Sequence, residues 1–380
     1  GWVGARTTDH AGLGDWVANH DRLPDGITGI AEDIENVGLK FGLWFEPEMT
    51  NKDSDLYREH PDWILSVPGR HDSHGRFQYV LDFSRKEVVD RIYEMMAKIL
   101  STAKVSYVKW DMNRSITECY SAALPADRQG EVFHRYILGV YDLYERLTST
   151  FPHVLFESCA ILYYAPQGWT SDDTDAIERI KIQYGTSMCY PISSMGSHVS
   201  VVPNHQTRRE APLKTRANAA YFGTFGYELD LNKLTAEEIE KVKKQVKFMK
   251  SYREVIQYGT FYRLASPFDD EECGWMVVSD DKKTAIVAWF RTLYTPNKCF
   301  TRMKLHGLDP DAIYSCNVLG GQALTVSKTP DGKLIYEKVS GDKGEDSAVN
   351  VIAGPSCYGD ELMNLGLITS DTSAGEIVGE

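Results

Sequence analysis

The sequence predicts an α/β fold, a (β/α)8 barrel followed by a small C-terminal antiparallel β-sandwich, and three observations support this prediction. Short apolar runs alternate with longer amphipathic stretches through residues 1–260, as in parallel sheets whose strands are joined by helices. Polar side chains that could take part in catalysis follow several of these runs, as they do at the strand ends of a barrel. The glycine-rich phosphate-binding turn that is typical of a doubly wound sheet is not found in the sequence. From residue 261 to 380 the apolar runs become short and are separated by turns. We therefore expect a barrel domain at 1–260 and a sandwich domain at 261–380.

The barrel elements follow from the spacing of apolar residues. Residues 26–37 repeat their apolar side chains near a helical period and predict a helix, whereas the apolar run 39–45 predicts a buried strand. The later segments are 86–100 (helix), 105–110 (strand), 131–148 (helix), 153–157 (strand), then 176–182, 197–202, 212–221 and 227–231, and a long helix at 236–256. About seven strands can be counted where a closed barrel has eight, and hardly any strand precedes the first helix.

The C-terminal region consists of strand-like runs separated by Asp-Asp, Pro-Asn and Gly-Gly turns. The runs are 260–262, 275–278, 284–290, 303–305 and 313–314. Short strands at this spacing are typical of a small antiparallel sandwich. The polar tail from residue 369 is expected to fray.

Composition and charge narrow the classes of function. The 380 residues carry 54 acidic and 41 basic side chains, a net charge of −13. This balance argues against a nucleic-acid or anionic-membrane partner, because both need a cationic face, and no apolar run is long enough to span a bilayer. The seven cysteines form no C-x-x-C pair, and the first residues do not resemble a secretory signal. We therefore expect a cytoplasmic, reducing location and a neutral small-molecule substrate.

The first candidate catalytic residue is Asp111, at the end of a predicted strand. Lys109 lies two positions earlier, so the two side chains point to the same face of the strand. A cation beside Asp111 favours the ionised form that a nucleophile needs, although a salt-bridged strand end fits the same spacing equally well. Glu46 and Glu157 also follow predicted strands, and we expect them to support Lys109 or Arg76 rather than to react.

The second candidate is Asp172, which lies in an acidic cluster with Asp173 and Asp175. Neighbouring carboxylates repel one another when partly buried, which favours the protonated form of one and makes it a candidate general acid. A helix is predicted from residue 176, and Asp173 or Asp175 could cap it instead. A cation site is less well supported, because the D-x-D-x-D-G pattern of a calcium loop is absent.

Aromatic residues near these carboxylates indicate a sugar site, because aromatic faces stack on the C–H faces of pyranose rings. They are Trp44, Trp110, Tyr163, Tyr164 and Trp169. Any one of them taken alone is better explained by core packing.

Four long motifs surround the candidate residues. They are Leu-Trp-Phe-Glu-Pro-Glu-Met (43–49), Tyr-Val-Lys-Trp-Asp-Met-Asn-Arg (107–114), Phe-Glu-Ser-Cys (156–159) and Trp-Thr-Ser-Asp-Asp-Thr-Asp (169–175). Together they resemble glycoside hydrolase family 36, the microbial α-galactosidases. Further matches to this family lie at 60–63, 81–84, 196–200, 203–206 and 359–363. The resemblance therefore covers almost the whole chain.

The resemblance implies a retaining exo-α-galactosidase that releases terminal α-linked galactose from sugars such as melibiose and raffinose. Asp111 would be the nucleophile and Asp172 the acid/base, with carboxyl groups roughly 5–5.5 Å apart, as double displacement requires. Five residues would bind galactose: Trp44, Arg76, Lys109, Asn113 and Cys159. The resemblance implies no metal and no cofactor, and family habit suggests a homo-oligomer, a tetramer.

The sequence departs from the family pattern at two places. Family members carry an Asp-Asp pair before the Gly-Trp that here is Gly1-Trp2, preceded by a large β-sandwich. We therefore expect a fragment that lacks this sandwich and the first barrel strand. Family members also carry a glycine-rich stretch after Phe-Glu-Ser-Cys, where this chain runs from Cys159 through Ala160 directly into Ile161. Either difference would reshape the sugar-binding subsite.

Other functions remain open. An α-N-acetylgalactosaminidase of the same family would need room near Cys159, at C2 of the sugar, and a raffinose-type transglycosylase would use both aspartates. The absent Asp pair and glycine-rich stretch suggest a non-catalytic sugar-binding fragment. A metal-dependent barrel enzyme is suggested by Lys109, Asp111 and Glu157, but no third spaced ligand follows them.

Overall fold

The computed structural model describes residues 2–159, 163–293, 296, 301–319, 323–328, 334–339 and 351–368. The chain forms two units, Gly1–Gly168 and Trp169–Glu380, and each is described by itself. The tail from residue 369, which was expected to fray, lies outside the described residues.

A four-stranded parallel sheet forms the centre of the first unit, in the order β1-β4-β5-β6. The strands are β1 (Phe41–Phe45), β4 (Val105–Trp110), β5 (Leu155–Ser158) and β6 (Gln167–Gly168). Lys109 of β4 pairs with Trp44 on one side and with Glu157 on the other. Glu157 in turn pairs with Gln167. Residues paired across a sheet lie in one row on the same face, so these four side chains stand next to one another.

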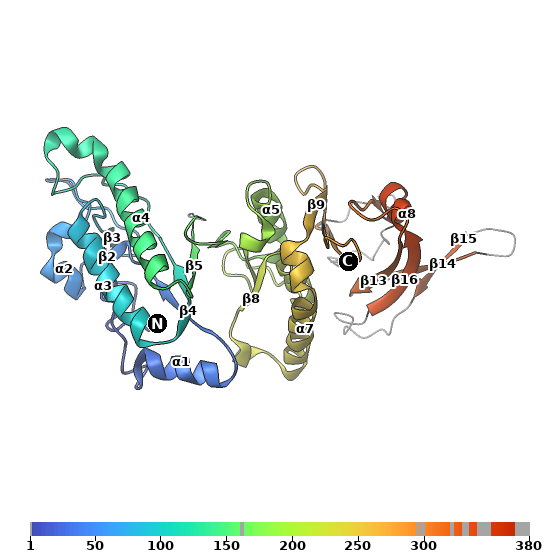
Figure 1. The fold of residues 1–380 in the computed structure, drawn as a ribbon, viewed down its shortest axis with the longest axis horizontal. Coiled ribbons are helices and arrows are strands. Elements are labelled where there is room, and N and C mark those ends of the chain that lie inside the picture. Colours follow the sequence, from blue (N-terminus) through green and yellow to red (C-terminus); the bar gives the residue numbers. More distant parts are fainter. Residues whose placement is uncertain are drawn as a thin grey trace. The chain divides into compact units, whose positions relative to one another are not determined.

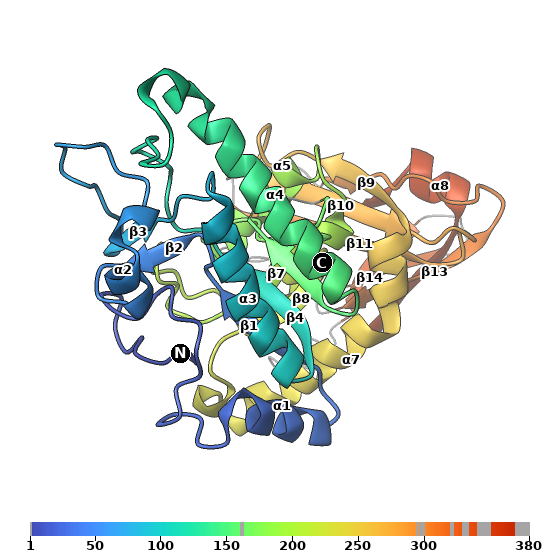
Figure 2. The same ribbon diagram turned by 60° about the vertical axis from the view of Figure 1, so that its left-hand side comes forward.

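Helices pack against this sheet. They are α1 (Gly26–Asn36), α3 (Lys86–Thr102) and α4 (Val132–Thr150). α3 and α4 lie side by side across one face of the sheet (Figures 1 and 2). Their buried residues recur every three or four positions and share one core with the strands; those of the central turns are Val88, Ile92, Met96, Tyr136, Val140 and Leu143. An apolar stripe of this period is what fixes each helix against the sheet.

A pair of short antiparallel strands lies next to the turn that carries Arg76. The strands are β2 (Met49–Asn51) and β3 (Gln78–Val80), with the short helix α2 (Asp55–Glu59) between them in the chain. Arg76 and Phe77 have φ angles of 52° and 59°, in the left-handed region that residues other than glycine rarely adopt. The turn is held because Asn51 Nδ2 donates a hydrogen bond to the Phe77 carbonyl at 2.8 Å. A strained turn kept in this way commonly presents a functional side chain.

The second unit begins with helices that alternate with two parallel strands. These elements are α5 (Ala176–Thr186), β7 (Gly196–Ser200), α6 (Leu213–Ala220), β8 (Thr224–Glu228) and α7 (Ala236–Tyr258). Thr235 and Glu238 form a capping box at the start of α7, which satisfies backbone N–H groups that have no partner inside the helix.

Antiparallel strands complete the second unit. The first sheet has the order β11-β10-β9, from β9 (Thr260–Ala265), β10 (Glu272–Val278) and β11 (Ala285–Arg291). The remaining strands form pairs: β12 (Arg302–Met303) with β17 (Leu367–Ile368), β13 (Ile313–Leu319) with β16 (Val351–Tyr358), and β14 (Ala323–Lys328) with β15 (Leu334–Val339). The helix α8 (Gly359–Asn364) follows β16, and Leu362 of this helix is buried in a core with Trp289 of β11.

Most of the elements predicted from the apolar spacing are confirmed. The helices expected at 26–37, 86–100, 131–148 and 236–256 are α1, α3, α4 and α7. Segments 176–182 and 212–221 belong to the helices α5 and α6.

The strand predictions are less accurate. The strand expected at 227–231 begins earlier, at Thr224 in β8, and β6 was not predicted. The described residues hold four parallel strands in the first unit and two in the second, one fewer than the sequence suggested. Within the described ranges, none of the helices combines the length and apolar character that a membrane span needs.

Candidate active site

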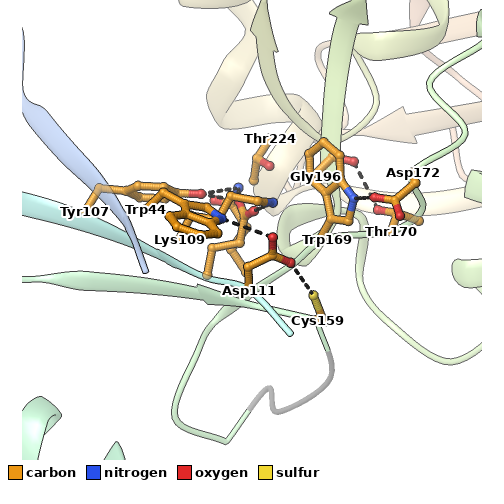
Figure 3. Close-up of polar contacts among 12 residues, drawn as sticks. Trp44, Tyr107, Lys109, Asp111, Cys159, Trp169, Thr170, Asp172, Gly196 and Thr224 are labelled. Atoms are coloured by element: carbon orange, nitrogen blue, oxygen red, sulfur yellow. Dashed lines mark hydrogen bonds and ion pairs between the residues drawn. The ribbon is translucent and has the colours of Figure 1, made fainter. Parts of the chain in front are cut away.

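Asp111 lies directly after β4, where β1 and β4 together hold its backbone. Its backbone N–H donates to the Phe45 carbonyl at 2.8 Å. Its carboxylate Oδ2 accepts hydrogen bonds from Trp44 Nε1 at 3.0 Å and from Asn113 Nδ2 at 2.8 Å. The other oxygen, Oδ1, accepts a hydrogen bond from the backbone N–H of Met112 at 3.0 Å. The Cys159 thiol lies 3.8 Å from the same oxygen (Figure 3). Hydrogen-bond donors from three segments of the chain thus fix the orientation of a half-buried carboxylate.

The Lys109 ammonium lies in the same row of the sheet and is held by a buried carboxylate. Lys109 Nζ is 2.7 Å from Glu157 Oε1, and Glu157 is only 2% exposed. The second oxygen of Glu157 accepts from Gln167 Nε2 at 2.5 Å and from the Tyr107 hydroxyl. Burial and the charge of Glu157 raise the pKa of Tyr107 well above its ordinary value, so this phenol remains a donor.

Glu46 lies behind Asp111, after the end of β1. It is fully buried, and its Oε1 accepts from the Asn113 backbone N–H at 3.2 Å and from Asn113 Nδ2 at 2.8 Å. Its Oε2 accepts from Gln78 Nε2 at 2.8 Å. Burial raises the pKa of Glu46 to about 7, a shift that the hydrogen bond from Asn113 opposes and the negative charge of Asp111 increases.

Asp172 belongs to the second unit, in the loop before α5. Its Oδ1 accepts a hydrogen bond from Trp169 Nε1 at 2.9 Å, and the residue is exposed to solvent (Figure 3). Asp175 instead caps α5: its Oδ1 accepts from the backbone N–H groups of Ile177 at 2.9 Å and Glu178 at 3.2 Å. Asp175 therefore caps the helix, as was expected for Asp173 or Asp175. Asp172 is a separate, exposed carboxylate.

A buried arginine holds the loop that carries Asp172. Arg179 of α5 is 2% exposed and donates to the carbonyls of Ser171 at 2.9 Å and Gly196 at 3.2 Å. Its guanidinium also lies 5.7 Å from the ring centroid of Trp169. Thr170 donates to the same Gly196 carbonyl at 3.0 Å (Figure 3), so the loop is tied to the start of β7.

Comparison with known proteins decides the family. Residues 1–259 match the family described as Melibiase, and residues 272–377 match the Glycosyl hydrolase family 36 C-terminal domain. The α-galactosidase AgaA of Geobacillus stearothermophilus is 53% identical over 329 residues, which are 84% of this chain and 45% of that protein. The chain belongs to glycoside hydrolase family 36.

A second relative and a solved structure show how far the likeness extends. The α-galactosidase Mel36A of Lactobacillus acidophilus is 48% identical over 337 residues, 85% of this chain and 46% of that protein. A crystal structure of a Geobacillus stearothermophilus AgaA variant in complex with raffinose matches 100% of this chain and 49% of its own, at 45% identity and a TM-score of 0.86. This likeness confirms the predicted fold class, a (β/α)8 barrel followed by a C-terminal β domain. The chain spans about half the length of these relatives.

In this family 36 chain, the first unit brings together most of the predicted site residues. Trp44, Asn113 and Cys159 contact Asp111, and Lys109 stands beside Trp44 in the sheet. Arg76 lies in the same unit, in the strained turn before β3. Asp172 lies in the other unit, so the spacing of roughly 5–5.5 Å from Asp111 stays a prediction.

Two expectations about individual residues are wrong. Trp110 was a candidate for the sugar site, but it is 2% exposed, stacks on Tyr144 with ring centroids 3.9 Å apart, and donates to Glu48. It therefore belongs to the core. Glu46 was expected to support Lys109 or Arg76, but its hydrogen bonds go to Asn113 and Gln78. The same expectation for Glu157, as support for Lys109, is confirmed.

Some members of the site were not found from the sequence. Tyr107 lies two residues before Lys109 on β4, and strand alternation alone could have placed it on the same face. Gln167 sits in a strand of only two residues, which is too short to leave an apolar pattern. Within the described ranges, no group of three or more His, Cys, Asp or Glu residues could hold a metal ion.

Proposed function

We propose that this chain is a retaining exo-α-galactosidase that hydrolyses terminal α-linked galactose from raffinose-type oligosaccharides. The observation that carries the proposal is the geometry of Asp111, whose carboxylate is held by Trp44 and Asn113 beside the paired Lys109. Membership of family 36 and the raffinose complex of a relative support the substrate class. Because the chain covers about half of its relatives' length, the activity is tested on this chain itself.

The proposed reaction uses two carboxyl groups in two steps. In the first, an oxygen of Asp111 bonds to the anomeric carbon while the glycosidic C–O bond breaks, and Asp172 gives its proton to the departing oxygen. In the second, Asp172 takes a proton from water, the water oxygen bonds to the anomeric carbon, and the bond to Asp111 breaks. The two displacements together retain the α configuration.

The remaining site residues are proposed to bind galactose. The Lys109 ammonium is fixed by Glu157 and would donate to sugar hydroxyls. Trp44 donates its indole N–H to Asp111, which leaves the ring to contact the sugar. Asn113 and Cys159 would act beside the nucleophile, and Arg76 would reach the sugar from its turn.

The stereochemistry of hydrolysis tests the proposal. Proton NMR of a reaction with para-nitrophenyl α-galactoside should show α-galactose as the first product, before mutarotation. β-Galactose as the first product, or no hydrolysis by this chain, would contradict it. Faster cleavage of the N-acetylgalactosaminide analogue would instead assign the α-N-acetylgalactosaminidase alternative, which Cys159 would have to accommodate.

A further inference from the structure

The Asn113 side chain connects two carboxylates. One Nδ2 hydrogen bond goes to Asp111 Oδ2 and the other to Glu46 Oε1, each at 2.8 Å. An amide nitrogen carries two hydrogens, so both are used. The Asn113 backbone N–H also donates to Glu46 Oε1, at 3.2 Å. Rotating the amide by half a turn would point its oxygen at both carboxylates, so Glu46 and Asp111 together fix its orientation.

Glu46 is built to accept hydrogen bonds. It is fully buried, and its hydrogen-bond partners, Asn113 and Gln78, all donate to it. A protonated carboxyl needs an acceptor for its own hydrogen, whereas in the orientations present here both amides turn their N–H groups toward Glu46. The charged groups that act on Glu46 are Asp111, which disfavours its ionisation, and Arg6, which favours it.

We infer that Glu46 is a positioning residue for the nucleophile: its carboxylate orients the Asn113 amide, and that amide holds Asp111 Oδ2 together with Trp44. The inference rests on the proposed function, since it gives Glu46 a part in the reaction of Asp111. Glu46 itself is buried behind Asn113 and does not react.

Two substitutions of Glu46 separate its hydrogen bonds from its charge. Glu46→Ala removes the acceptor and frees the Asn113 amide to rotate. Glu46→Gln keeps an acceptor oxygen for Asn113 but cannot be charged. The new amide hydrogens can be accommodated because Gln78 Oε1 is buried without a hydrogen-bond partner, and a flip of the Gln78 amide would turn this oxygen toward them.

The kinetic result expected follows from this difference. Glu46→Ala should lower kcat for para-nitrophenyl α-galactoside by about tenfold or more while KM changes less than about threefold. Glu46→Gln should recover only part of kcat, because a neutral amide oxygen is a weaker acceptor for Asn113 than a carboxylate. It should also lose the acid limb of kcat/KM that we expect near pH 7 in the natural protein, where Glu46 changes from a neutral carboxyl group to this stronger acceptor.

Glu48→Gln is the matched control. Glu48 is also buried, at 4% exposed. Its carboxylate oxygens accept hydrogen bonds from Trp110 Nε1 and from the Tyr136 hydroxyl, and Glu48 does not contact the Asn113 amide that holds Asp111. This variant should keep the acid limb of the natural protein. If Glu46→Gln and Glu48→Gln have the same pH profile, or if Glu46→Ala keeps its full kcat, the inference is wrong.

A structural measurement keeps the inference separate from the proposed function. In a crystal structure of the Glu46→Ala protein, Asn113 Nδ2 should have moved beyond hydrogen-bonding distance of Asp111 Oδ2. An unchanged bond would overturn the inference even if the protein is active. If the natural protein shows no hydrolysis, the proposed function fails, and this distance alone decides the role of Glu46. If Glu46→Ala does not fold, the pH profile of Glu46→Gln decides it.

Discussion

Asp111 receives its hydrogen bonds from side chains that come from separate segments of the chain. Trp44 is on β1, Asn113 follows β4, and Cys159 follows β5. The ends of neighbouring parallel strands meet at one edge of the sheet, which is why residues so far apart in sequence reach one carboxylate. No comparable set of donors surrounds Asp172 in the described part of the chain, where its carboxylate accepts a hydrogen bond from Trp169 Nε1.

The proposed acid role of Asp172 predicts how an Asp172→Ala variant will behave. Removing the acid should slow galactosides with poor leaving groups by about a hundredfold or more, because their departing oxygen must be protonated. Aryl galactosides with acidic leaving groups should be affected much less in the first step. Steady-state rates across a series of leaving groups measure this dependence. An equal loss for all of them would remove Asp172 from the acid role.

The protonation of Glu46 should also be visible in stability. Its pKa is raised from 4.5 to about 7 in the folded protein, so between these values the folded state binds more protons than the unfolded state. The stability that this group contributes is present at low pH and is lost as the pH rises through 7. Relative to Glu46→Gln, the natural protein should lose on the order of 3 kcal/mol of unfolding free energy between about pH 4 and pH 8. Urea unfolding of both proteins across this range measures the difference, and a constant difference would contradict the prediction.

At the scale of elements, α5 links the start of β7 to the loop that carries Asp172. Arg179 reaches two carbonyls from this helix, those of Ser171 and Gly196. Burial lowers the pKa of Arg179, because a charge is less favourable away from water. A buried guanidinium with two fixed acceptors is suited to holding a loop in one geometry.

Arg179→Lys should loosen this loop, because one ammonium cannot serve both carbonyls in the geometry of a guanidinium. We expect unfolding free energy to fall by about 1–3 kcal/mol, and hydrolysis of galactosides with poor leaving groups to fall more than hydrolysis of activated ones. Arg209→Lys is the control, since Arg209 pairs with the Asp175 cap and with Glu178 and should affect stability alone. The same leaving-group dependence in both variants would contradict this role for Arg179.

The long amphipathic helices could be predicted from the sequence because their apolar residues recur at a helical period. α3 and α4 each bury such a stripe, and their predicted ends differ little from the observed ones. β8 was placed too late because Tyr227, Leu229 and Leu231 continue the apolar pattern, whereas the strand is set by its pairing with Gly196–Ser200. Pairing between distant strands leaves no local signal, so the register of the strands could not be predicted from the sequence.

The site shows the same limit at the level of single residues. Asp111, Lys109 and Asn113 lie within one motif and could be recognised together. The hydrogen bonds that Glu46 accepts from Asn113 and Gln78 join three segments, and which acceptor meets which donor depends on the fold. Trp110 was assigned to the sugar site because it lies next to Asp111, but strand alternation turns it to the opposite, buried face.

At the scale of the whole chain, the proposed reaction needs a residue from each unit. Asp111 belongs to Gly1–Gly168 and Asp172 to Trp169–Glu380. Double displacement requires their carboxyl groups to flank one glycosidic bond. The role of each aspartate stays a prediction that chemistry can test.

Covalent trapping tests the nucleophile most directly. A galactosyl donor with a good leaving group and a fluorine beside the anomeric carbon forms the glycosyl-enzyme faster than water can release it, because the fluorine disfavours the positive charge of both transition states. After proteolysis, mass spectrometry should find the added sugar on the peptide that contains Asp111, and an Asp111→Ala protein should acquire no label. A label on another carboxylate, or turnover of galactosides by the Asp111→Ala protein at the natural rate, would show that Asp111 is not the nucleophile.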